Sequence, residues 1–295
     1  MSAQRQVDQD GRAEVVPGGD PGELRTVPAT DGVGLACRYF PPVGNARARI
    51  LYLHGVQSHG GWYTETAAEL AGLGYAVTLL DRRGSGLSGG VRGDFAGPDQ
   101  LVGDVACVLA ETTTWDAGLG TVVVGGCWGA RPALEYALRH PGELAALVLV
   151  CPALAARVDL SPRNKARVFA GRLLRPQTRV PIPLRPELFT ENPPFLDFIR
   201  NDPLSLRDVS ARFFFEQFFW DRRLRQLETL AVPLLVLQSG RDDIVDVDVV
   251  RAWFDRLVAP RKDYRLYDDF GHILDFEDDR GRYWADLGTW LEETI

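Results

Sequence analysis

One cysteine framed by glycines constrains the fold of this 295-residue chain more than any other feature. Residues 122–130 read Val-Val-Val-Gly-Gly-Cys-Trp-Gly-Ala, and a helix-forming segment, 131–138, follows directly. A strand that turns straight into a helix holds its central residue in a strained conformation, and Cβ atoms two residues to either side would collide. Gly125 and Gly129 therefore predict a sharp strand-turn-helix unit with Cys127 at its apex.

The same turn predicts a chemical role for Cys127. The pattern is a Gly-x-Ser-x-Gly nucleophile turn in which a thiol replaces the hydroxyl. The thiol would lie at a helix N-terminus, where unpaired N–H groups and the helix dipole favour the reactive thiolate. A small buried core residue is the ordinary fate of a free cysteine. The glycines on both sides favour the nucleophile.

Composition and charge exclude several classes of protein. The hydrophobic content of 45% is ample for a core, and no apolar stretch is long enough to span a membrane. Residues 1–22 lack the apolar region of a signal peptide and are expected to form a disordered leader. The four cysteines have neither metal-ligand nor disulfide-framework spacing, which favours the cytoplasm. The net charge of −7 argues against a nucleic-acid partner.

Short apolar segments alternate with helical ones along most of the chain. Strands are expected at 33–40, 48–53, 76–81, 121–126, 146–150, 233–237 and 263–267, and helices at 64–73, 98–109, 131–138, 248–258 and 283–291. Such alternation predicts an α/β fold, with a mostly parallel sheet covered by helices on both faces.

Residues 153–230 interrupt this alternation of strands and helices. They contain many prolines, a dense aromatic run and no clear strand. Long structureless loops are rare, so a helical lid is expected here, between core segments 23–152 and 231–295. Aromatic side chains of this kind are usually core residues. A lid also lines the pocket over the nucleophile, which makes four side chains candidates for substrate binding: Phe214, Phe215, Phe218 and Phe219.

A nucleophilic thiol needs a base and a carboxylate that orients the base. Of the four histidines, His272 follows the last expected strand, at the sheet edge where ligands bind in α/β folds. Asp242 directly follows the strand at 233–237 and is the expected acid, with Asp243 as the alternative. Acyl chemistry also needs two N–H donors for the developing oxyanion. We expect them from Trp128, the residue after the nucleophile, and from Val56, in the loop after an early strand.

Several motifs resemble the α/β-hydrolase superfamily, and the monoacylglycerol lipase or lysophospholipase-like branch in particular. They are His54-Gly55, Gly61-Trp62-Tyr63, Gly74-Tyr75-Ala76-Val77, Asp81-Arg82-Arg83-Gly84-Ser85-Gly86-Leu87-Ser88 and Arg92-Gly93-Asp94-Phe95. The resemblance covers about residues 24–291 and is weakest in the lid. It implies a Cys127–His272–Asp242 triad and oxyanion donors at Val56 and Trp128, with no metal or organic cofactor.

Cys127 departs from that branch, which has serine there. In the superfamily, cysteine nucleophiles are found in dienelactone hydrolases, polyhydroxyalkanoate synthases and some thioesterase domains, so the resemblance leaves the acyl acceptor open. Hydrolysis of an ester or thioester with an apolar or aromatic acyl group is the first expectation. The alternatives are an acyltransferase or cyclase with the same triad, and a non-catalytic binding protein or a serine-to-cysteine variant on this fold.

A basic stretch bears on the substrate. Residues 157–185 contain eight basic side chains and one acidic side chain, Asp159. A solvated helix face is the ordinary explanation of such a run. The functional alternative is attraction of an anionic substrate or partner, such as a coenzyme A thioester or an acyl carrier protein.

Overall fold

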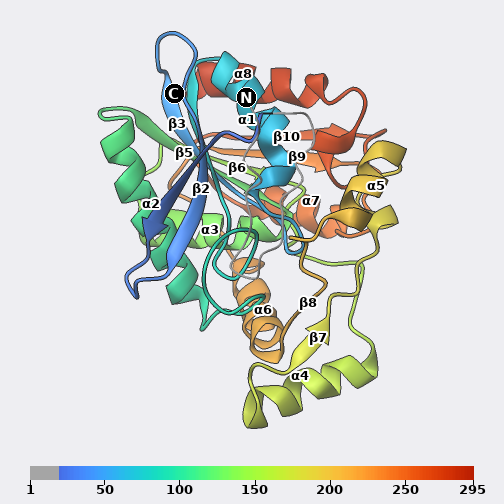
Figure 1. Ribbon diagram of the computed structural model, residues 1–295. Coiled ribbons are helices and arrows are strands. Elements are labelled where there is room, and N and C mark those ends of the chain that lie inside the picture. The colour runs from blue at the N-terminus through green and yellow to red at the C-terminus, as the bar shows by residue number, and fades with distance from the viewer. Residues whose placement is uncertain (1–19) are drawn as a thin grey trace.

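An eight-stranded sheet forms the centre of the computed structural model, which describes residues 20–295 (Figure 1). Its strand order is β1-β2-β4-β3-β5-β6-β9-β10, and all neighbours from β4 to β10 are parallel. The expected leader, 1–22, lies outside the described residues except for its last three. The α/β prediction is confirmed.

The central strands are buried because both of their faces carry apolar side chains. Val122, Val123 and Val124 of β5 are fully buried. The predicted strands have the bounds β2 (Gly34–Phe40), β3 (Ala48–Leu53), β4 (Tyr75–Leu80), β5 (Gly120–Gly126), β6 (Ala146–Val150), β9 (Leu234–Ser239) and β10 (Lys262–Tyr267). The last of these, β10, lies at the sheet edge and is only half-buried. The edge strand β1 (Glu23–Pro28) was not predicted, because it is polar and mostly exposed.

Helices pack in pairs against this sheet. The pairs are α1 (Thr64–Gly72) with α8 (Gly281–Thr294), and α2 (Pro98–Trp115) with α3 (Ala130–Arg139), and helices cover both faces (Figure 1). The helix α7 (Val247–Arg256) follows β9. Among the described residues, no helix is both long and apolar enough to cross a membrane.

The segment between β6 and β9 lies beyond the sheet, and we call residues 153–230 the cap (Figure 1). It contains α4 (Pro162–Leu174), α5 (Pro193–Asn201) and α6 (Ala211–Leu224). It also contains a strand pair that was not apparent in the sequence, β7 (Arg179–Pro181) with β8 (Asp208–Ser210). Three-residue strands carry too little alternation to be read from a sequence.

Candidate active site

The turn after β5 has the strained geometry that its glycines predict. Cys127 has a φ of 49°, in the region that side chains other than glycine rarely adopt. A Cβ atom on Gly125 would lie 2.8 Å from Cα of Ala130, and one on Gly129 would lie 2.1 Å from the carbonyl oxygen of Leu53. Only glycine fits at these two positions, so the backbone fixes the location of the Cys127 thiol.

His272 and Asp242 form a buried pair after the neighbouring strands β10 and β9. Nδ1 of His272 lies 2.9 Å and 2.8 Å from the two carboxylate oxygens of Asp242. The backbone N–H groups of Ile244 and Val245 donate to the same carboxylate, at 2.9 and 2.8 Å. These contacts fix the carboxylate, whereas the alternative acid, Asp243, is exposed.

The surroundings of His272 favour its protonated form. Burial lowers the pKa of His272, but the charges of Asp242 and Cys127 and the hydrogen bonds with both side chains outweigh it and raise the pKa to about 10. The buried Nε2 makes no regular hydrogen bond within residues 20–295, and the side chain that acts on it there is Cys127. A buried polar atom in this situation calls for an explanation, and the neighbouring thiol provides one.

The loop after β3 lies against Cys127. A Cβ atom on Gly55 would lie 3.4 Å from Cβ and 3.6 Å from Sγ of Cys127. Val56 follows Gly55, and Trp128 is the second residue of the 3₁₀ turn Cys127–Gly129, where helical N–H groups have no internal acceptor. The two expected oxyanion donors thus belong to the two segments that meet at Cys127.

Arg82 was missed by the sequence analysis, although it stands in the Asp-Arg-Arg-Gly turn. Its guanidinium donates to the carbonyl oxygens of Gly55 at 3.0 Å and Val56 at 3.1 Å, and lies 4.6 Å from the ring of Trp128. Since the described peptide bonds are trans, a Gly55 carbonyl that points at Arg82 directs the Val56 N–H away from it. Arg82 therefore orients the loop.

The environment of Arg82 is unusual for a cation. Burial lowers its pKa to about 9, against the opposing effects of Asp81 and Cys127. Within the described part of the chain, Arg82 forms no ion pair with a carboxylate. Buried cations normally have such a partner. Arg82 therefore places a positive charge, balanced only by the nearby charges of Asp81 and Cys127, behind the loop that faces Cys127.

A cavity of about 690 Å³ opens over Cys127, between the sheet edge and the cap. Val56 and Trp128 line it from the core side. Of the four candidate phenylalanines, Phe214, Phe215 and Phe218 line it from α6, and Phe219 does not. Phe219 is half exposed and packs on Phe215 and Phe218 instead, because the turn of α6 directs it away from the cavity.

A second thiol, Cys151, lies close to the pair. Ligand atoms of Cys151, Asp242 and His272 lie within 4.8 Å of one another. Cys151 is 1% exposed and does not line the cavity, and burial raises its pKa well above the ordinary value. Metal ions bind thiolates, and this environment keeps the thiol protonated. The three residues therefore fit a hydrogen-bonded pair beside a structural cysteine better than a metal site.

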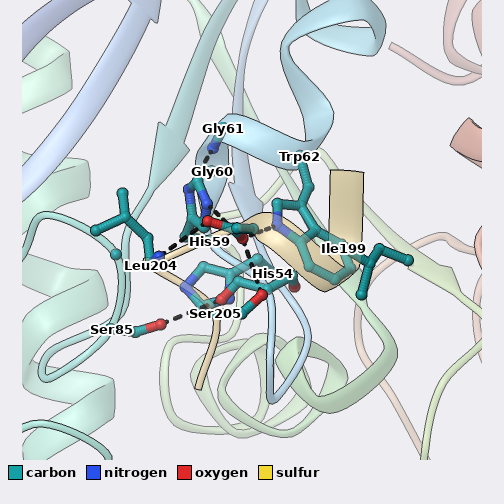
Figure 2. A network of polar contacts seen from close by, with 12 residues as sticks. His54, His59, Gly60, Gly61, Trp62, Ser85, Ile199, Leu204 and Ser205 are labelled. Carbon is teal, nitrogen blue, oxygen red and sulfur yellow. Dashed lines mark hydrogen bonds and ion pairs between the residues drawn. The ribbon is translucent and has the colours of Figure 1, made fainter. Parts of the chain in front are cut away.

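Buried polar contacts join the cap to the loop after β3 (Figure 2). The Asp202 carboxylate of the cap accepts hydrogen bonds from Nε1 of Trp62 at 2.7 Å and from the Ser205 hydroxyl at 2.8 Å, and lies 3.2 Å from Nε2 of His59. Burial raises the pKa of Asp202, but His59 and the hydrogen bonds outweigh this and lower it to about 2. This contact could not be predicted from the sequence, because Trp62 and Asp202 lie 140 positions apart.

A second connection runs through Trp128. Its indole N–H donates to the side-chain oxygen of Gln217 on α6 at 2.9 Å, and Phe213 packs on its ring with centroids 4.9 Å apart. Next to it, Arg131 of α3 forms an ion pair with Asp221 of α6 at 2.6 Å. The residue after Cys127 is therefore held from both the core and the cap.

Comparisons with known proteins agree with this architecture. Human monoglyceride lipase is 29% identical over 249 residues, which are 83% of this chain and 81% of the lipase. Monoacylglycerol lipase of Mycolicibacterium smegmatis is 25% identical over 265 residues, 88% of this chain and 93% of that protein. The crystal structure of Paleococcus ferrophilus monoacylglycerol lipase superimposes with a TM-score of 0.79 at 22% identity, over 88% of this chain and 99% of that one. The serine aminopeptidase S33 family model matches residues 44–279, and the chain therefore belongs to this family of α/β-hydrolases.

Proposed function

We propose that the protein hydrolyses a carboxylic ester or thioester through a Cys127–His272–Asp242 triad. The observation that carries the proposal is the position of Cys127, on a strained turn at the floor of a 690 Å³ cavity, next to a histidine held by a buried carboxylate. Family membership and lipase relatives support ester hydrolysis. The phenylalanines of α6 support an apolar or aromatic acyl group.

In the proposed reaction, the Cys127 thiolate attacks the acyl carbon, and the carbonyl oxygen becomes an oxyanion bound by the N–H groups of Val56 and Trp128. The bond to the leaving group breaks as the His272 imidazolium gives that group the Nε2 proton. Water then attacks the thioester and gives a proton back to Nε2. The bond between the acyl carbon and Sγ then breaks. The carboxylic acid leaves the cavity, and the starting thiolate–imidazolium pair is restored.

Cys127 is the better candidate of the two thiols near His272. Nucleophilic attack requires an accessible thiolate, and Cys127 lines the cavity. Cys151 is more deeply buried and has a raised pKa. The two residues provide a matched pair for experiment, because both have left-handed backbone conformations, with φ of 49° and 45°.

Acyl transfer is the second candidate function, and the sulfur atom itself favours it. A thioester acyl-enzyme reacts with amines and alcohols more readily than an oxygen ester does, so an acceptor in the cavity would compete with water. The Cys127 intermediate is common to both reactions. They differ in the second step alone.

The proposal is tested by intact-mass spectrometry after mixing with p-nitrophenyl esters and acyl thioesters of graded chain length. We expect an acyl adduct in the wild type and in Cys151→Ala, and none in Cys127→Ala. Turnover with and without an added amine then separates hydrolysis from transfer. An acyl adduct of unchanged yield in Cys127→Ala would contradict the proposed triad.

A further inference from the structure

The cavity over Cys127 is not uniformly apolar. Its wall includes four basic side chains, Arg131, Arg157, Lys165 and Arg225, and two acidic ones, Asp159 and Asp221. An apolar acyl group alone has no use for these charges, which cost free energy when a ligand removes their water. The pairing of the six groups therefore indicates what the cavity is built to bind.

Two of the four cations are neutralised by neighbouring carboxylates. Arg131 donates to both carboxylate oxygens of Asp221, at 2.6 and 3.0 Å. Lys165 forms an ion pair with Asp159. Both acidic residues of the wall are thereby used. Arg157 and Arg225 form no ion pair with any carboxylate in residues 20–295.

One hydrogen bond ties Arg225 to the backbone segment that carries Arg157. Arg157 is exposed at the cavity wall, Arg225 is half-buried, and the backbone N–H of Arg157 donates to the carbonyl of Ile244 at 2.8 Å. The Arg225 guanidinium lies 3.4 Å from the carbonyl oxygen of Leu154, three positions before Arg157. The phenylalanines Phe214, Phe215 and Phe218 line the cavity from α6. The cavity thus combines an aromatic wall with a region that has positive charge and no counter-ion.

We infer that the substrate carries an anionic group, a carboxylate or a phosphate, which binds Arg157 and Arg225 while its apolar part lies on the phenylalanines. This inference names the substrate class and rests on the proposed acyl chemistry at Cys127. Guanidinium groups bind both anions through paired N–H donors. The anion belongs either to the far end of the acyl chain or to the leaving group.

Two pairs of probes distinguish these sources. The first pair compares the p-nitrophenyl monoester of suberic acid with p-nitrophenyl octanoate, which has the same chain length without the terminal carboxylate. The second pair compares octanoyl-4′-phosphopantetheine with octanoyl-pantetheine, so that the leaving group alone gains the charge. In one of the two pairs we expect the wild-type kcat/KM to be about tenfold higher for the anionic probe, as for other hydrogen bonds to charged groups.

The variants Arg157→Gln and Arg225→Gln should each reduce this preference severalfold, and the double variant should abolish it. Arg163→Gln removes the same charge from an exposed position of α4 that does not line the cavity, and should leave the preference unchanged. The preference should also shrink in 0.5 M salt, because screening weakens such contacts. Equal kcat/KM within both pairs, or an anion preference unaffected by the double variant, would overturn the inference.

Binding separates this inference from the proposed reaction. Calorimetric titration of Cys127→Ala with monomethyl suberate and dimethyl suberate, and with phosphopantetheine and pantetheine, requires no catalysis. Anion-dependent binding that the double arginine variant removes would support the inference even if Cys127 formed no acyl adduct. Acylation of Cys127 without any anion preference would leave the proposed function intact and contradict the inference.

Discussion

The carboxyl edge of the sheet and the cap that faces it are built in different ways. At the sheet edge, backbone sterics fix the turn around Cys127, and a single Cβ atom on Gly129 would overlap the Leu53 carbonyl. In the cap, α4 buries only Val168 and Gly171, and Leu173 and Leu174 are more than 80% exposed. The candidate reacting groups all belong to the rigid region, and the aromatic cavity wall belongs to the cap. We infer that the chemistry is fixed by the sheet and substrate choice by the cap.

The largest effect is expected from Gly129→Ala, which tests the rigidity of the sheet edge directly. The added methyl group would lie 2.1 Å from a backbone oxygen, so the turn would have to move. We expect a loss of at least ~3 kcal/mol in unfolding free energy, the upper range for overpacking, or no folded protein. Denaturant titration followed by circular dichroism measures it. Gly103→Ala, with nothing within 4 Å of the new methyl group, is the control.

Arg82→Met should reduce kcat strongly while the fold persists. The variant removes both hydrogen bonds that orient Gly55 and Val56. Loss of one oxyanion donor costs about 10²- to 10³-fold in kcat, and we expect an effect near 10² because the N–H is misplaced rather than removed. KM should change little. Alkylation of Cys127 by iodoacetamide forms no oxyanion, so the rate of alkylation should fall much less than kcat. Equal losses in both assays would argue against the positioning role.

Asp202→Asn should loosen the cap and leave the sheet intact. The carboxylate accepts hydrogen bonds from Trp62, Leu204 and Ser205 in a buried site, and an amide in its place turns one acceptor into a donor. We expect a cost of about 2 kcal/mol, typical of a broken buried polar contact. Hydrogen exchange should rise in α5 and stay unchanged in β5. Faster exchange in β5 as well would show that the two regions unfold together.

Alkaline pH should weaken the His272–Asp242 pair. The pKa of His272 is raised from 6.5 to about 10, so the folded protein keeps a proton that the unfolded chain loses. This contribution to stability is complete below pH 6.5 and is lost as pH rises towards about 10. Unfolding titrations at pH 7 and pH 9.5 should therefore show a larger loss for the wild type than for His272→Gln. Identical losses would contradict the raised pKa.

The smallest effect should come from Leu174→Ser, on the exposed face of α4. The side chain is 81% exposed, and such surface changes alter unfolding free energy by less than about 0.5 kcal/mol. Val168→Ser, one of the two buried positions of the same helix, should cost several times more. Thermal or denaturant unfolding measures both losses. An equal loss of unfolding free energy in the two variants would mean that Leu174 is covered in solution.

The sequence predicted those features that depend on neighbouring residues. The glycines around Cys127 specify the turn locally, and Asp242 and His272 are recognisable because each follows a strand. Arg82 and Asp202 act on residues 27 and 140 positions away, for which one sequence carries no periodic signal. The sequence did not separate Phe219 from the three phenylalanines that line the cavity, because an aromatic run does not reveal which face of a helix is turned inward.

Trp128 connects the sheet edge to the cap. Its backbone belongs to the strained turn, while Gln217 and Phe213 of α6 hold its ring. These two contacts therefore connect the position of α6, which lines the cavity, to the peptide unit next to Cys127.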